Sequence, residues 1–283
     1  MLRDILKQTR HRFAAAGLAT PDLDTRILVR HYLSLSDADL ITGQGNATPE
    51  KLGLLEKAVI RRLSGEPVSR ILGYREFWGM NFKITPDTLD PRPDTERLVE
   101  MAVESMRNSP PRQILDLGTG TGCILLALLK EFPDARGTGV DINPGAVDVS
   151  RENMENNGLS GRAAFLQGNW TESLPDSVES YDLIVSNPPY IPLGDIESLA
   201  PEVRNHDPIL ALSGGGDGLD AYKIVVREIK KILSPAGRAF LEIGQNQHDD
   251  VQRLVEESGL RVIRIEPDLS GILRVLEIGH GDK

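Results

Sequence analysis

The chain of 283 residues has one cysteine, Cys123, and no run approaching the roughly 18 apolar residues of a membrane span. A single cysteine cannot form an internal disulfide, and no group of Cys and His residues has metal-ligand spacing. The segment from Met1 to Arg12 is polar and lacks the apolar core and cleavage site of a signal peptide. We therefore expect a cytoplasmic protein with no metal and no membrane partner.

Basic residues are scarce in the second part of the chain. The net charge is -10, and residues 1–100 contain 15 Lys and Arg against 14 Asp and Glu. Residues 101–283 hold the remaining 17 basic and 28 acidic residues. A protein that grips duplex DNA usually presents a basic face, because neutralising phosphates supplies much of the affinity. This balance argues against free nucleic acid as the substrate.

The first part of the chain has a helical pattern. Apolar residues recur three and four positions apart over 2–16, 22–33, 36–42 and 49–64. Pro21-Asp22, Ser36-Asp37 and Thr48-Pro49-Glu50 are typical helix starts. The pattern predicts a small helical domain.

Strand-like alternation first occurs at Phe77–Ile84, which predicts a hairpin. Pro91-Arg92-Pro93 interrupts regular structure, and a helix is expected from Asp94 to Met106. Asn108-Ser109-Pro110-Pro111 marks the last break before a different pattern begins. We therefore expect three parts: a helical domain over 1–75, a hairpin and linker over 76–110, and a catalytic domain over 111–283.

Strands and helices alternate from Gln113 onward. The expected strands are 114–117, 137–141, 163–167, 181–186, 238–243, 261–266 and 272–278, and the expected helices are 121–132, 143–157, 221–233 and 248–258. Such alternation predicts an α/β fold in which a seven-stranded, mostly parallel, doubly wound sheet has helices on both faces.

The suggestive residues of this domain follow the expected strands. Gly118-Thr119-Gly120-Thr121-Gly122 follows the first, Asp141 ends the second, and Trp170 comes after the third. Ligands of such sheets bind beyond the carboxyl ends of the strands. There the glycines would allow a ligand to approach the backbone, the Asp141 carboxylate could accept from ribose hydroxyls, and the Trp170 indole could cover an adenine. Taken singly, these residues are also typical of a tight turn, a helix N-cap and a core side chain. Their order on consecutive strands favours a nucleotide-like ligand.

The segment Asn187-Pro188-Pro189-Tyr190 follows the fourth strand. An amide or aryl amine nitrogen is a poor nucleophile, so it must be oriented toward an electrophilic methyl group. The Asn187 side-chain oxygen and the Pro188 carbonyl are suitable acceptors for its two N–H groups, Pro188 and Pro189 stiffen the turn, and Tyr190 can stack on the planar group. The alternative is an ordinary proline-rich loop. The segment predicts methyl transfer from S-adenosyl-L-methionine to a planar nitrogen.

These residues resemble the HemK/PrmC family of protein-(glutamine-N5) methyltransferases, which modify the Gly-Gly-Gln glutamine of peptide chain release factors. The resemblance rests on Asp116–Gly122, Val140-Asp141, Asn187–Tyr190, Gly65-Glu66-Pro67, Gly73–Trp78, Pro91–Glu96 and Gly215–Leu219, and it covers nearly the whole chain. It implies a class I methyltransferase fold, with S-adenosyl-L-methionine as cofactor and a release factor as protein partner.

The resemblance also implies roles for individual residues. Gly118 to Gly122 would line the methionine moiety, Asp141 would bind ribose, Trp170 would flank the adenine, and Asn187 to Tyr190 would bind the glutamine side chain. The N-terminal helices would bind the release factor away from its catalytic loop.

Two positions depart from the family pattern. Asp90 stands before Pro91 where an apolar residue is usual, and Asp207-Pro208 replaces Glu-Pro. For Arg92 a role in the pocket and a role in tying down the linker remain equally open.

Three other methyltransferases are possible: an adenine-N6 enzyme acting on DNA, a guanine-N2 enzyme acting on RNA, and a glutamine enzyme acting on a ribosomal protein. The acidic second part and the absence of a basic or aromatic insertion argue against DNA. The linker segments around Glu76-Phe77-Trp78 and Arg92 favour the release factor enzyme. A non-catalytic cofactor-binding protein would be expected to lose Asn187 or the glycines. We expect a monomer with no direct nucleic-acid partner.

Overall fold

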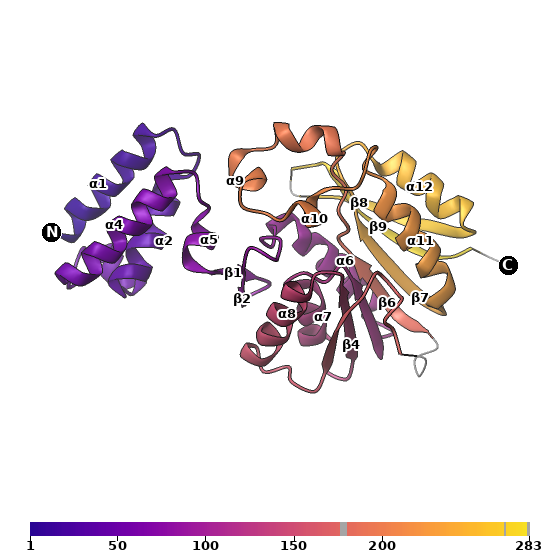
Figure 1. The fold of residues 1–283 in the computed structure, drawn as a ribbon. Coiled ribbons are helices and arrows are strands. Elements are labelled where there is room, and N and C mark those ends of the chain that lie inside the picture. The colour runs from indigo at the N-terminus through magenta and orange to yellow at the C-terminus, as the bar shows by residue number, and fades with distance from the viewer. Residues whose placement is uncertain (176–179, 269, 282–283) are drawn as a thin grey trace. The chain divides into compact units, whose positions relative to one another are not determined.

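The computed structural model describes residues 1–175, 180–268 and 270–281. The chain divides into two compact units, Met1–Gly73 and Tyr74–Lys283. The finer division at residues 75 and 110 stays a prediction. Figure 1 shows the helices and strands of both units.

The first unit is built from helices. They are α1 (Leu2–Ala15), α2 (Pro21–Leu33), α3 (Asp37–Thr42), α4 (Pro49–Leu63) and α5 (Val68–Leu72). The predicted starts are confirmed: Ser36 forms a reciprocal capping box with Asp39, and the Thr48 hydroxyl accepts from the backbone N–H of Lys51. The sequence did not predict α5, because five residues are too few to display a helical period.

A buried ion pair lies among these helices. Arg62 of α4 donates to Asp24 of α2 at 2.7 Å, and both side chains are almost fully buried. The Thr20 hydroxyl donates to the other oxygen of Asp24. The pair ties α2 to α4 beside a core that includes Phe13, Leu28 and Val59.

The second unit begins with an antiparallel hairpin of β1 (Tyr74–Phe77) and β2 (Met80–Lys83). Its turn residues Trp78 and Gly79 both have positive φ, the turn geometry that matches the twist of paired strands. The hairpin is confirmed, but it begins before Phe77. Its first strand buries only Phe77, so its sequence has no apolar alternation.

The main sheet has seven strands in the order β5-β4-β3-β6-β7-β9-β8. Their bounds are β3 Gln113–Leu117, β4 Arg136–Asp141, β5 Ala163–Gln167, β6 Tyr181–Ser186, β7 Leu233–Glu242, β8 Leu260–Pro267 and β9 Leu273–His280. β9 runs antiparallel to its neighbours β7 and β8, whereas the pairs among β5, β4, β3, β6 and β7 are parallel. The predicted mostly parallel, doubly wound sheet is confirmed.

Helices cover both faces of this sheet (Figure 1). The main ones are α6 Glu96–Met106, preceded by the turn η1 Pro93–Thr95, with α7 Cys123–Glu131, α8 Pro144–Asn156, α11 Asp220–Ile232 and α12 His248–Glu257. Side chains of α6, α7 and α8 pack with Ile114 of β3, and side chains of α11 and α12 pack with Leu115. Consecutive residues of the central strand therefore supply opposite cores, which explains why two apolar residues stand side by side at Ile114 and Leu115.

The segment between β6 and α11 contains three short helices that the sequence did not predict. These are η2 Leu193–Ser198, α9 Pro201–Arg204 and α10 Ile209–Leu212. Across the described ranges, the structure has no helix that is both long and apolar enough to span a membrane.

Candidate active site

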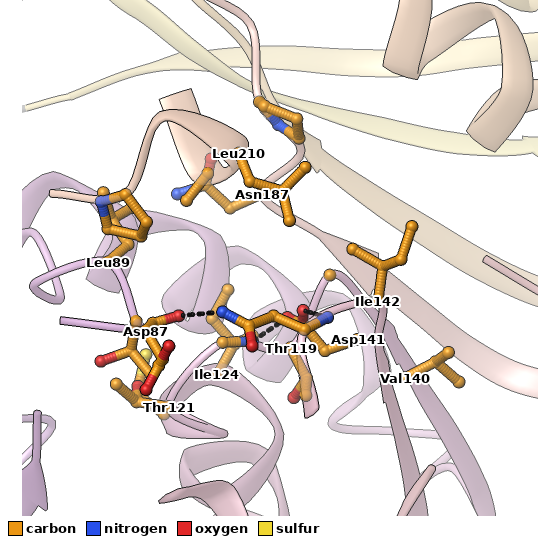
Figure 2. A pocket seen from close by; sticks show the side chains of 18 of the residues that line it. Asp87, Leu89, Thr119, Thr121, Ile124, Val140, Asp141, Ile142, Asn187 and Leu210 are labelled. Atoms are coloured by element: carbon orange, nitrogen blue, oxygen red, sulfur yellow. Dashed lines mark hydrogen bonds between the residues drawn. The ribbon is translucent and has the colours of Figure 1, made fainter. Parts of the chain in front are cut away.

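A cavity of about 260 Å³ lies at the carboxyl ends of the parallel strands. Strand order reverses between β3 and β6, which is where open α/β sheets bind ligands. Of the residues singled out from the sequence, the wall includes Gly118, Thr119, Gly120, Thr121, Asp141, Trp170, Asn187 and Pro189. Gly122, Pro188 and Tyr190 do not line it. In Figure 2, Asn187 and Leu210 lie on one side of the cavity, with Asp87, Thr119 and Thr121 on the other.

The glycine turn after β3 presents bare backbone to this cavity. Gly118 and Gly120 have φ of +75° and +54°, a region that favours glycine. A Cβ on Gly120 would meet nothing within 4 Å, and one on Gly118 would meet only the Trp170 ring at 3.9 Å. Both positions therefore border space that a side chain would fill, as a ligand cradle requires.

Gly122 has a different environment. It is buried, and a Cβ there would come within 3.1 Å of the Phe165 ring on β5. This glycine allows the start of α7 to pack closely against the sheet, and its predicted contact with a cofactor stays a prediction.

Hydrogen bonds hold the turn in place. The backbone N–H groups of Gly118 and Thr119 both donate to the Val140 carbonyl on β4. The Thr119 hydroxyl donates to Asp116 at 2.6 Å. Burial raises the pKa of Asp116 to about 7; the Thr119 hydrogen bond opposes this shift and the charge of Asp141 adds to it.

Asp141, the last residue of β4, is an acceptor at the cavity wall. Its two carboxylate oxygens accept from the backbone N–H groups of Gly120 at 2.8 Å and Asn143 at 2.9 Å. Burial raises its pKa, and these two bonds oppose the shift. Each oxygen retains acceptor capacity, which suits a ribose diol. Asp141 does not cap the next helix, because Asn143 fills the N-cap position of α8.

Trp170 combines a packing role with a place at the wall. The ring packs against the core on the α11 side of the sheet, and its backbone has a φ of +55°. The side chain is half-buried and lines the cavity. Its contact with an adenine stays a prediction.

Asn187 follows β6 and lines the opposite wall. Its Nδ2 donates to the Thr95 hydroxyl at 3.3 Å. Within the described ranges, no protein group donates to the Asn187 amide oxygen or to the Pro188 carbonyl. These are the two acceptors that the sequence predicts for an amide nitrogen.

Tyr190 lies behind the wall, packed against the α11 side of the core. Burial raises the pKa of its hydroxyl above the ordinary value, and the nearby carboxylate of Glu242 adds to the shift. The glycines of the following loop fit tightly against this segment. A Cβ on Gly214 would lie 2.8 Å from the Pro189 carbonyl oxygen, and one on Gly218 would lie 2.5 Å from that of Tyr190. Gly218, from the segment Gly215–Leu219 that resembles the family pattern, and the preceding Gly214 therefore support the backbone of the Asn187–Tyr190 turn.

Two residues that sequence reasoning missed lie beside Asn187. The Thr95 hydroxyl donates to Glu242 Oε2 at 2.7 Å, and both side chains are buried. Burial raises the pKa of Glu242 to about 7, against the effect of hydrogen bonds from the side chains of Thr95 and Asn187. Glu242 ends β7, so the rule that sites form at carboxyl ends of strands was the signal that could have found it.

The two departures from the family pattern meet at one place. Arg92 pairs with the buried carboxylate of Asp207, which also accepts from the backbone N–H of Asp90 at 3.3 Å. Arg92 and Pro208 line the cavity. Arg92 therefore both faces the cavity and ties the linker to the loop before α10.

No group of three or more His, Cys, Asp or Glu side chains among the described residues is placed to hold a metal ion. The cavity thus presents glycine backbone, the Asp141 carboxylate and the Asn187 carboxamide to a ligand.

Comparison with known proteins gives two domain matches. Residues 4–73 match the PrmC N-terminal domain, and residues 96–199 match the methyltransferase small domain. The release factor glutamine methyltransferase of Rhodospirillum rubrum is 47% identical over 277 residues, covering 98% of this chain and 84% of that protein. Its counterpart in Cereibacter sphaeroides is 43% identical, covering 95% of this chain and 94% of that protein.

Among solved structures, a ribosomal protein L11 methylase from Lactobacillus delbrueckii has a TM-score of 0.52 and 18% identity. The match covers 69% of this chain and 83% of that one. At this identity the likeness concerns the fold alone.

Proposed function

Because this chain belongs to the family of release factor glutamine methyltransferases, we propose that it methylates the N5 amide nitrogen of the Gly-Gly-Gln glutamine in a peptide chain release factor. The cofactor is S-adenosyl-L-methionine. The observation that supports this function most is the Asn187 carboxamide at the cavity wall, whose nitrogen is bound by Thr95 while its oxygen has no protein donor in the described ranges.

The residues of the cavity fit the cofactor. Gly118 and Gly120 border space that a side chain would fill, and Asp141 offers acceptor capacity for the ribose hydroxyls. Trp170 is placed to flank the adenine. When bound, S-adenosyl-L-methionine supplies the electrophilic methyl group.

The protein's own contribution is positioning. The Asn187 oxygen and the Pro188 carbonyl accept from the two N–H groups of the glutamine amide, which fixes the plane of the nucleophile and stabilises positive charge as it grows on N–H. Pro188 and Pro189 hold this turn rigid, and Tyr190 supports it from behind. The proton leaves to water, and S-adenosylhomocysteine is the other product.

The partner and the setting follow from the same proposal. The unit Met1–Gly73, which matches the PrmC N-terminal domain, binds the release factor away from its Gly-Gly-Gln loop. The enzyme works as a monomer in the cytoplasm, where release factors act.

The test uses cofactor labelled in its methyl group. The protein is incubated separately with release factor, with its Gln→Ala variant in the Gly-Gly-Gln loop, with ribosomal proteins and with DNA. We expect label on the wild-type release factor alone. Label that survives the Gln→Ala change, or that appears on ribosomal protein or DNA instead, would contradict the assignment.

A further inference from the structure

Asn187, which is half-buried at the cavity wall, is the first member of a hydrogen-bonded chain of three side chains. Its Nδ2 donates to Thr95 Oγ1 at 3.3 Å, and Thr95 Oγ1 donates to Glu242 Oε2 at 2.7 Å. Thr95 and Glu242 are each 2% exposed. The chain therefore ends on a carboxylate that water barely reaches.

This chain has a direction. A hydroxyl has one proton to donate, and an ionised carboxylate can only accept. Once Thr95 gives its proton to Glu242, its oxygen can only accept from Asn187. The Asn187 side chain must then turn its NH₂ group, not its oxygen, toward Thr95.

The direction matters because the two ends of a carboxamide are nearly equal in shape. With its NH₂ group toward Thr95, Asn187 can offer its oxygen to the N–H of a substrate amide. In the flipped state it would present N–H to N–H, which removes the acceptor and adds repulsion.

We propose that Thr95 and Glu242 are positioning residues that hold the Asn187 carboxamide in the orientation needed to accept from the substrate amide. This inference rests on the proposed methyl transfer and deepens it. Neither residue needs to touch the reacting atoms, because both act through Asn187.

The surroundings of Glu242 set the pH range of this device. Burial raises its pKa to about 7, and Asp94 adds to the shift. The Thr95 hydrogen bond, the charge of Arg274 on β9 and a hydrogen bond from the Asn187 side chain oppose it. The hydroxyls of Tyr190 and Tyr222 remain neutral, because burial raises the pKa of each. Above about pH 7 the carboxylate is ionised and the direction is fixed. Below it, a protonated Glu242 can donate to Thr95 and release the constraint.

The first test compares Thr95→Val with Thr95→Ser. Valine keeps the shape but removes the hydroxyl, whereas serine keeps the hydroxyl. For Thr95→Val we expect kcat to fall about tenfold or more, with KM and binding affinity for S-adenosyl-L-methionine unchanged, since only an interaction with the reacting amide is lost. Thr95→Ser should remain within about threefold of wild type.

The pH profile separates positioning from a merely structural role. Wild-type kcat should decline as pH falls below about 7, and this limb should disappear in Thr95→Val. Wild-type turnover in Thr95→Val, an equal loss in Thr95→Ser, or an unchanged pH limb would each overturn the proposal. If the wild-type protein does not methylate release factor at all, the proposed function fails instead.

A second pair of variants decides the matter if Thr95→Val does not fold. Asn187→Asp places a second carboxylate beside the Thr95 hydroxyl. The carboxylates of Asp at position 187 and of Glu242 then compete for the single hydroxyl proton of Thr95. Adding Glu242→Gln reverses the chain, because the new amide donates to Thr95 and Thr95 donates to position 187. We expect the double variant to be about tenfold more active than Asn187→Asp alone. Equal activity of the two would overturn the proposal.

Discussion

The carboxylate of Asp141 accepts a hydrogen bond from the backbone N–H of Gly120 at 2.8 Å, across 21 positions of sequence. This contact joins the end of β4 to the turn that follows β3, so the cofactor's ribose and methionine contacts are expected to depend on each other. The Asp141 carboxylate therefore has a role other than helix capping, since Asn143 is the N-cap of α8.

Asp141→Asn should weaken binding of S-adenosyl-L-methionine about tenfold or more, because an amide has one acceptor oxygen where the carboxylate has two and lacks its charge. Isothermal titration with S-adenosylhomocysteine measures the effect. Asp148→Asn on the following helix is the matched control, because it removes the same formal charge from an exposed side chain. Equal loss in both variants would mean that Asp141 acts only through overall charge.

Gly120→Ala should abolish detectable cofactor binding while costing only about 1–2 kcal/mol of stability, the usual price of a left-handed non-glycine residue. The added methyl group projects into space that borders the cavity. Gly158→Ala is the control, since Gly158 also has positive φ and open surroundings but lies away from the cavity. Normal cofactor binding by Gly120→Ala would show that the glycine turn does not contact the cofactor.

Asn187→Ala should lower kcat about a hundredfold or more, in the range found when one preorganised group is removed from a reacting centre. Affinity for the cofactor should stay close to wild type, because the glycine turn and Asp141 are untouched. Methyl incorporation into release factor, measured beside titration calorimetry, separates the two effects. Asn205→Ala is the control, because the Asn205 side chain is exposed. Normal turnover by the Asn187→Ala enzyme would refute the catalytic assignment.

The stability of the second unit should depend on pH through Glu242. Its folded pKa of about 7 lies above the ordinary 4.5, so the folded state binds this proton more tightly than the unfolded state. Its contribution is therefore present below about pH 4.5 and is lost as pH rises to about 7, by at most about 1.4 kcal/mol per pH unit.

The measurement compares wild type with Glu242→Gln in urea from pH 5 to 8. Both tryptophans, Trp78 and Trp170, belong to the unit Tyr74–Lys283, so their fluorescence reports its unfolding. Relative to the variant, wild type should lose free energy of unfolding as pH rises from 5 to 7. Glu257→Gln, at the exposed end of α12, controls for net charge. Parallel pH curves for wild type and Glu242→Gln would contradict the prediction.

The sequence predicted the elements of the fold because their signals are local. Helix starts such as Ser36 and Thr48, and the apolar runs of the central strands, depend on neighbours within a few residues. The glycine turn, Asp141 and Asn187 were found in the same way, since each directly follows or ends a strand. The helix α5 and the short helices between β6 and α11 were not predicted, because they are too short to display a helical period in the sequence.

The grouping around Asn187 was decided by tertiary structure. Thr95 is 92 positions away from Asn187 and 147 from Glu242, and no local pattern relates them. The pairing of Ser186 with Leu241 sets Asn187 and Glu242 at the ends of adjacent strands, and the turn before α6 brings Thr95 between them. Likewise, Arg92 and Asp207 meet across 115 positions. Sequence alone determined which residues stand at the ends of strands. Strand order and register decided which of these residues are in contact, because a buried polar group needs a hydrogen-bond partner and only the packed chain brings distant residues within reach.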